Sequence, residues 1–257
     1  MSENSKVEPA TTNDTVDAIA GSTQRDAFPL RRAFLQQKQG GKSTPGPIAS
    51  FVAAGDRTGL LLYCLAVTKA SESPWDVSLH SAVWARALGL TNPTGQAARG
   101  RVSKTWSRLV DRKLVSRARR QRMAEFTLLK EDSSGEAYTR PTSHFINVPH
   151  ALWTDGPEGD RWYRVLDLPE LTFLLIGLSN LDSFPLPAER GPEYYGISAD
   201  TVQRGYQGLR KKGLLTVDKK RILTPLAPEG VTYENRYTLQ SPFGPRGKAS
   251  RAVSPVR

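Results

Sequence analysis

Apolar and polar positions repeat the same order of elements in two stretches of the chain. Each stretch begins with an apolar helix, continues through a shorter helix and a turn, and ends with a long helix and strand-like runs. Helices are recognised by apolar residues three or four positions apart, and strands by short runs rich in β-branched residues. The pattern predicts an α+β protein, mainly helical, with two similar domains in tandem.

In the first stretch, the pattern predicts an opening helix over residues 58–70 and a second helix that Ser78 caps. The run Gly89-Leu90-Thr91-Asn92-Pro93 breaks the second helix, and Thr94 is expected to cap the long one. A basic hairpin over residues 114–129 follows. The apolar side chains of the long helix are spaced four, four and three residues apart and predict one buried stripe: Ala98, Val102, Trp106 and Leu109.

The second stretch repeats this order. An opening helix is predicted over residues 168–179 and a short one over 188–195, with a turn at Gly196-Ile197. Ser198 is expected to cap the long helix, which ends before Gly213. The predicted strands are residues 214–217 and 222–225, which meet at a charged tip over 218–221, and residues 233–239.

Both ends of the chain differ from these stretches in composition. Residues 1–46 are poor in apolar residues and contain Gly40-Gly41 and Pro45-Gly46-Pro47, so we expect a disordered arm. Asp132-Ser133-Ser134-Gly135 indicates a loop between the domains, and Phe145–Pro149 resembles a strand. The predicted organisation is an arm at 1–46, a first domain at 47–131, a linker at 132–142, a second domain at 143–241 and a basic disordered tail at 242–257.

The net charge of the chain favours a polyanionic partner. The formal charge is +11, and residues 94–122 contain ten basic residues but one acidic residue, Asp111. A solvated helix surface usually mixes both signs, so this concentration of positive charge favours contact with nucleic-acid phosphates.

Cysteine content and hydropathy argue against disulfide-bonded, zinc-finger, membrane-spanning and secreted proteins. Cys64 is the only cysteine, which excludes an internal disulfide and a cysteine-based zinc finger. No apolar run approaches the roughly 18 residues that a membrane span needs, and residues 1–20 are polar and acidic, unlike a signal peptide. We therefore expect a cytoplasmic, nucleoid-associated protein with no membrane contact.

The first long helix and its hairpin supply the first set of candidate DNA contacts. On a helix of 100° per residue, several basic side chains fall on one stripe beside the buried arc. The candidates in this half are Gln96, Arg99, Arg101, Lys104, Arg108 and Arg112 in the helix, and Arg117, Arg119, Arg120 and Arg122 in the hairpin.

The second long helix carries side chains that can distinguish bases. Arginine can bind guanine through two hydrogen bonds and glutamine can bind adenine in the same way, whereas lysine mainly contacts phosphate. The candidates in this half are Ser198, Asp200, Gln203, Arg204, Gln207 and Lys211 in the helix, and Lys219, Lys220 and Arg221 in the charged tip.

Part of the second stretch resembles the helix-turn-helix core of bacterial winged-helix regulators and of tandem winged-helix plasmid replication initiators. The matching residues are Tyr194 to Val202, continued by Leu209-Arg210-Lys211-Lys212-Gly213-Leu214-Leu215. Ala87-Leu88-Gly89-Leu90 with residues 109–115 is a looser copy. The resemblance spans residues 75–130 and 165–240 and implies two winged helix-turn-helix domains in tandem. The resemblance implies that a wing holds Lys219, Lys220 and Arg221 and that the recognition helices hold Arg99, Arg101, Lys104, Arg108, Ser198, Gln203, Arg204 and Gln207. Gly95 and Gly100 depart from the usual pattern, since each weakens a helix by about 1 kcal/mol relative to alanine.

These features favour sequence-specific binding of double-stranded DNA, as in a bacterial transcriptional regulator. A plasmid-type replication initiator, which would hold repeated origin sites through a monomer–dimer switch, is the first alternative, and a protein-binding module is the second. An enzyme is not expected, because His80, His144 and His150 lie far apart and no phosphate-binding or dinucleotide-binding glycine motif occurs. No cofactor or metal is expected, and a homodimer remains open.

Overall fold

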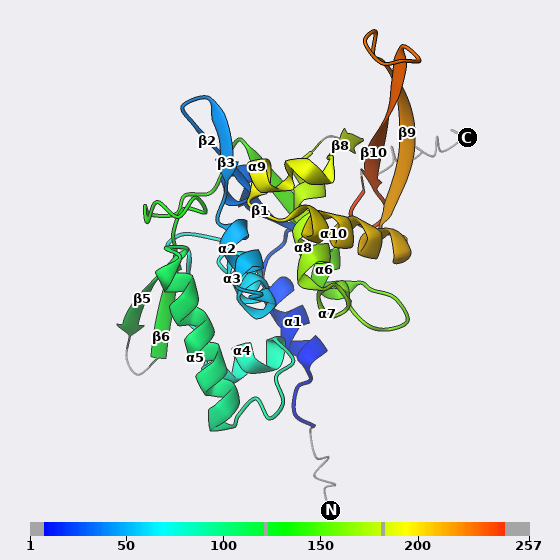
Figure 1. Ribbon diagram of the computed structural model, residues 1–257. Helices are drawn as coiled ribbons and strands as arrows, with labels where there is room; N and C mark the ends of the chain where they lie inside the picture. Colours follow the sequence, from blue (N-terminus) through cyan, green and yellow to red (C-terminus); the bar gives the residue numbers. More distant parts are fainter. Residues whose placement is uncertain (1–7, 121–122, 181–182, 245–257) are drawn as a thin grey trace, which may run out of the picture.

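The computed structural model describes residues 8–120, 123–180 and 183–244, which form an α+β fold (Figure 1). Within these residues, the fold has ten α-helices and four small antiparallel sheets, and the β2–β3, β5–β6 and β9–β10 hairpins lie at its periphery (Figure 1). None of the helices described is long and apolar enough to cross a membrane. The two predicted stretches form two bodies with the same order of elements.

The first body is built around two long helices and a three-stranded sheet. Its strands are ordered β4-β6-β5, and the ring of Trp106 stacks on Phe126 of the sheet with centroids 3.9 Å apart. This contact fixes the long helix against the hairpin. The elements are α3 (Arg57–Lys69), β4 (Asp76–Val77), α4 (Ser81–Ala87), α5 (Gln96–Asp111), β5 (Val115–Arg120) and β6 (Met123–Leu128).

The second body has the same topology. Its strands are ordered β8-β10-β9, and Phe173, Tyr206 and Tyr237 contact one another across the helix–sheet interface. The elements are α8 (Leu168–Leu178), β8 (Phe184–Pro185), the 3₁₀ turn η2 (Ala188–Arg190), α9 (Gly191–Tyr195), α10 (Ala199–Lys211), β9 (Leu215–Leu223) and β10 (Val231–Leu239).

The cap of α10 is as predicted, whereas the predicted caps of α4 and α5 are wrong. The Ser198 hydroxyl accepts a hydrogen bond from the Thr201 backbone at 3.2 Å, and Gly213 ends the helix region with a φ of 71°. Because β4 pairs with β6, the chain is still extended near Ser78, and α4 starts only after His80. The Nδ1 atom of His80 caps α4 by accepting a hydrogen bond from the Ala82 backbone N–H. Thr94 hydrogen-bonds to the Asn92 side chain within the preceding turn, and α5 starts after Gly95 without a side-chain cap.

The expectation of a disordered arm at 1–46 is wrong for the described residues. The N-terminal segment is folded, and strand β1 pairs with β7 (Phe145–Pro149), the predicted strand after the linker. The physical reason is that apolar side chains of the segment, such as Val16 and Phe28, find their buried contacts on distant parts of the chain. The elements are α1 (Thr12–Ala20), β1 (Ala27–Arg31), the turn η1 (Arg32–Phe34), β2 (Gln36–Gln39), β3 (Lys42–Pro45) and α2 (Ile48–Ala53).

The predicted linker at 132–142 is anchored by the buried Tyr138 and Pro141, whereas residues 134–137 are exposed. Glu131 just before it is fully buried and pairs with Arg31, and the buried Tyr138 ring packs against Trp75. Beyond β7, the short helices α6 (Ala151–Thr154) and α7 (Trp162–Val165) lead into α8. A single cluster of buried side chains therefore runs through both bodies. Of the predicted tail at 242–257, Phe243 is buried, and residues 245–257 lie outside the described residues.

Candidate nucleic-acid interface

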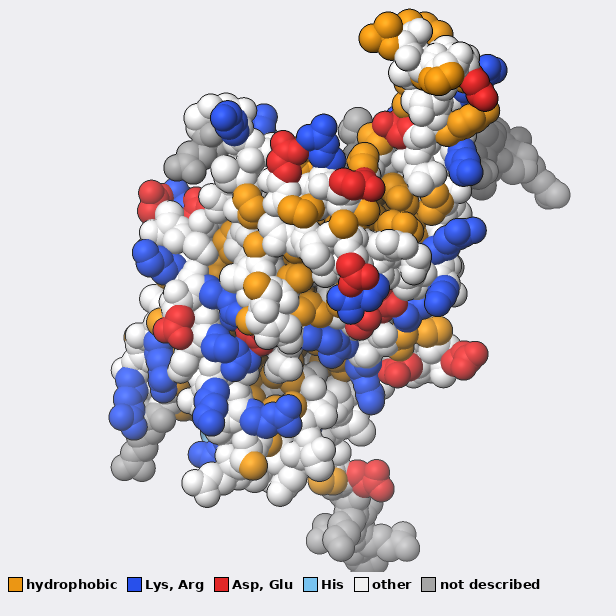
Figure 2. All heavy atoms as spheres, in the orientation of Figure 1, with side chains coloured by type: hydrophobic (Ala, Val, Ile, Leu, Met, Phe, Trp, Pro, Cys, Tyr) orange, Lys and Arg blue, Asp and Glu red, His pale blue; other side chains and the backbone are white. Residues whose placement is uncertain are grey.

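Helix α5 exposes basic side chains along its first three turns. Val102 and Trp106 anchor its buried face, which leaves the polar candidates on the opposite side in solvent. Arg99 is held near the start of α4, because its Nε donates to the Ser81 hydroxyl at 3.3 Å. Lys and Arg side chains gather over α5 and the neighbouring hairpin (Figure 2). The exposed candidates of this helix are Gln96, Arg99, Arg101 and Lys104.

Arg112 does not belong to this exposed face, which corrects the prediction. Arg108 and Arg112 both bind Asp56, with N–O distances of 2.7 Å, and the Arg112 guanidinium lies 4.2 Å from the centre of the Phe51 ring. The Arg112 side chain is only 13% exposed, whereas Arg108 remains 42% exposed. Helical periodicity gives the direction of a side chain but not the partner that another helix presents to it. Arg112 therefore holds α5 to α3, and Arg108 shares that role.

Asp56 has its own structural function at the start of α3. Its carboxylate accepts a hydrogen bond from the Gly59 backbone at 2.9 Å and so caps the helix. Burial raises the pKa of Asp56, but hydrogen bonds from Arg108 and Arg112 outweigh burial and bring that pKa down to about 2. The charged group therefore stabilises the junction of α3 and α5 at neutral pH.

The β5–β6 hairpin adds exposed arginines beside α5. Arg117 and Arg119 lie two residues apart on β5, so they project from the same face of the strand. Arg117 also lies 5.9 Å from the centre of the Phe126 ring. The side chain of Arg120, and Arg122 as a whole, lie outside the described residues.

Helix α10 presents the second group of candidates. Asp200, Gln203, Arg204, Gln207 and Lys211 are all exposed, and Arg204 pairs with Asp200 at 3.0 Å. Ser198 is exposed as well, but its hydroxyl is used as the helix cap. In the free protein, Asp200 therefore orients the Arg204 guanidinium along the exposed surface of the helix.

Two glycines that the sequence interpretation missed set the position of α10. A Cβ atom at Gly205 would lie 2.7 Å from the Pro169 carbonyl oxygen, and one at Gly208 would lie 2.1 Å from the Glu170 carboxylate. The spacing of these glycines, three residues apart on the side away from the polar candidates, is the signal that could have revealed the close packing. The glycines let α10 pack directly on the start of α8.

The predicted charged tip at 218–221 is wrong, because those residues lie within strand β9. The strand pairs with β10 without interruption from Leu215↔Leu239 to Leu223↔Val231. The turn comes later, over residues 224–230, where Pro225, Pro228 and Gly230 provide the turn residues that 218–221 lack. Lys219, Lys220 and Arg221 are exposed along the arm of a hairpin that projects from the body (Figure 1).

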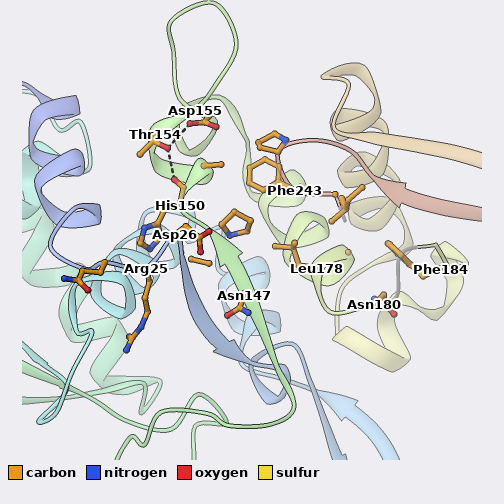
Figure 3. A pocket seen from close by; sticks show the side chains of 18 of the residues that line it. Arg25, Asp26, Asn147, His150, Thr154, Asp155, Leu178, Asn180, Phe184 and Phe243 are labelled. Carbon is orange, nitrogen blue, oxygen red and sulfur yellow. Dashed lines mark hydrogen bonds between the residues drawn. The ribbon is translucent and has the colours of Figure 1, made fainter. Parts of the chain in front are cut away.

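A polar groove of about 1070 Å³ lies apart from these surfaces, between the N-terminal segment, α6, α8 and the end of β10. Arg25, Asp26 and His150 lie along one wall, and Leu178 and Phe184 lie along the other (Figure 3). Burial lowers the pKa of His150, and its Nε2 has no hydrogen-bond partner among the described residues. Because both acidic and basic side chains line it, the groove does not extend the basic surface.

Within the described residues, no cluster of three or more His, Cys, Asp or Glu side chains could hold a metal ion. Cys64 is buried, and burial raises the pKa of its thiol to about 12. Comparison of the chain with protein-family models, curated proteins and solved structures finds no match.

Proposed function

We propose that this protein binds double-stranded DNA through two winged helix-turn-helix modules, as a sequence-specific transcriptional regulator. The observation that carries the proposal is that both bodies have one order of elements and one strand order. In each, a helix, a short edge strand, a short helix, a long helix and a hairpin follow one another, with the last strand in the middle of the sheet. That is the order of elements of a winged helix, in which the long helix enters the major groove.

The exposed side chains support different roles for the two modules. In the first, Arg101 and Lys104 of α5 and Arg119 of the hairpin are cations suited to phosphate contacts. In the second, Gln203, Arg204 and Gln207 of α10 carry groups suited to base edges. We infer that the first module supplies affinity and the second supplies sequence preference.

The contacts that hold the second body to the first body and to the N-terminal segment favour a fixed spacing of the two recognition helices. Arg57, at the start of α3, donates hydrogen bonds to the backbone carbonyls of Leu166 and Tyr163 just before α8. A Cβ atom at Gly196, in the turn before α10, would lie 2.9 Å from Pro45 and Ala49 of the N-terminal segment. A rigid pair of modules suits a DNA site with two half-sites at constant separation. This feature equally suits a replication initiator that holds origin repeats, which is our second candidate.

Selection of duplexes from a random DNA pool by the full-length protein tests the proposal. We expect enrichment of a site with two conserved blocks. Insertion of either five or ten base pairs between them should reduce affinity, because ten base pairs restore the helical phase but add about 34 Å that a rigid pair of modules cannot span. Binding should weaken steeply with salt, with a slope near 0.9 per phosphate contacted. Retention of no duplex would overturn the proposal and favour the protein-binding alternative. Enrichment of tandem repeats of the site would favour the initiator over the regulator.

A further inference from the structure

The distal part of the β9–β10 hairpin exposes large apolar side chains. Leu226 in the turn is 99% exposed, Leu223 is 78% exposed and Tyr233 is 63% exposed. Among the described residues, the only other exposed large apolar side chain is Met123, in the first hairpin. Apolar side chains gather at the tip of the projecting hairpin (Figure 2). An apolar cluster on a projecting element indicates a contact surface.

Strand alternation places the unpaired cations and the apolar residues on one face of this hairpin. Near the body, one face of β9 packs on the helices through Leu215 and Val217. The same face continues at every second residue, through Lys219, Arg221 and Leu223. Across the ladder, Tyr233 lies opposite Arg221, and an uncharged Asn235 lies opposite Lys219.

The other face has balanced charges. Lys220 lies opposite Glu234, and Asp218 lies opposite Arg236. The helix-side face therefore carries two cations without an acidic residue opposite them, followed by an apolar end. This combination suits a DNA minor groove, whose phosphates attract cations and whose base steps can accept inserted apolar side chains.

The length of the hairpin matches the distance between neighbouring grooves. From Val217 to Leu223 the strand extends about 20 Å, at about 3.3 Å per residue. A major groove and the next minor groove lie about 17 Å apart along the axis, which is half of a 34 Å turn. With α10 in a major groove, the hairpin is long enough for its tip to reach the adjacent minor groove.

We propose that Leu226 inserts as an apolar wedge into that minor groove and bends the duplex, while Lys219 and Arg221 contact the flanking phosphates. The inference rests on the proposed DNA binding by α10. An undeformed minor groove is about 6 Å wide, and two strands about 4.8 Å apart with their side chains do not fit within it. Entry of the tip therefore requires the groove to open, and insertion of apolar side chains between base steps opens it with bends of about 20–90°.

Fluorescence energy transfer across a 24-base-pair duplex tests the wedge. The duplex carries the selected site at its centre and a donor and an acceptor at its ends, and 2-aminopurine placed at successive positions reports unstacking. The full-length protein should increase energy transfer and raise 2-aminopurine fluorescence at one base step. Leu226→Ser should abolish both signals while affinity changes by less than about tenfold, because the cost of unstacking a base step is offset by the contacts that the bend permits. Leu226→Met should retain both signals.

The outcomes separate the wedge from DNA binding itself. Failure of the unaltered protein to bind any duplex would overturn the proposed function. Binding with equal bending by the unaltered protein and Leu226→Ser would overturn the wedge alone. Light scattering without DNA provides the third result: a dimer that Leu226→Ser dissociates would assign the apolar tip to a second copy of the chain and would also overturn the wedge.

Discussion

Arg161 and Asp17 form a two-pronged ion pair, with both N–O distances 2.8 Å, across 144 positions of the sequence. The pair joins helix α1 to the start of α7, so it links the N-terminal segment to the second body. Arg161 also donates a hydrogen bond to the Trp153 carbonyl oxygen. The N-terminal segment is therefore a structural part of the fold.

Helix α1 should contribute measurably to stability. Ile19 is 3% exposed, so Ile19→Ala should lower the free energy of unfolding by about 2–4 kcal/mol through lost burial and the cavity left behind. Ala18→Ser, at an exposed position of the same helix, should change it by less than about 0.5 kcal/mol. Urea unfolding followed by circular dichroism measures both. Equal stability of the two variants would show that α1 is not docked in solution.

The Asp56 cluster should make stability dependent on pH in the acid range. The pKa of Asp56 lies at about 2 in the folded protein against 3.8 for an unperturbed carboxyl, which corresponds to about 2 kcal/mol. Because the folded-state pKa is the lower one, this contribution is present above pH 3.8 and is lost as pH falls towards 2. The stability difference between the unaltered protein and Asp56→Asn should therefore shrink between pH 4 and pH 2. A difference independent of pH over that range would contradict the ion-pair assignment.

Replacement of glycine by alanine should change the stability of the protein in opposite directions in helices α10 and α5. Gly205→Ala forces a Cβ atom against the backbone of Pro169 and should destabilise the protein by about 1–3 kcal/mol. Gly100→Ala in α5 meets no atom within 4 Å and should stabilise the protein by up to about 1 kcal/mol through helix propensity. Thermal unfolding of the two variants tests the close packing of α10 on α8. Stabilisation by both substitutions would show that α10 lies farther from α8.

The two modules should differ in what they contribute to DNA binding. Gln207→Ala or Arg204→Ala should cost about 1–3 kcal/mol on the selected site and relax the preference at one base pair. Arg119→Ala should weaken all duplexes alike and reduce the salt slope by about 1. Arg112→Ala serves as the control, since its partner is Asp56: it should lower stability while leaving the salt slope unchanged. Affinities measured against salt for selected and scrambled duplexes test these roles, and identical behaviour of Arg204→Ala and Arg119→Ala would contradict them.

The sequence by itself determined the local elements of both bodies. The apolar stripe of α5, the boundaries of α8 and the Ser198 cap of α10 follow from spacing and cap chemistry, which depend on neighbours within a few residues. The exposure of the polar residues on α10 follows from the same periodicity.

Only the tertiary structure decided which surfaces cover one another. Val16 and Phe28 belong to a segment that is poor in apolar residues. Helix α1, which carries Val16, contacts α3, α4 and α6, and the Phe28 ring packs against Trp153, more than 100 positions away. Arg112 has the periodicity of an exposed residue but pairs with Asp56 from another helix. The course of β9 through Lys219 to Arg221 was fixed by its pairing with β10. Long-range pairing of this kind leaves no local pattern in a single sequence, because its energy comes from contacts between segments.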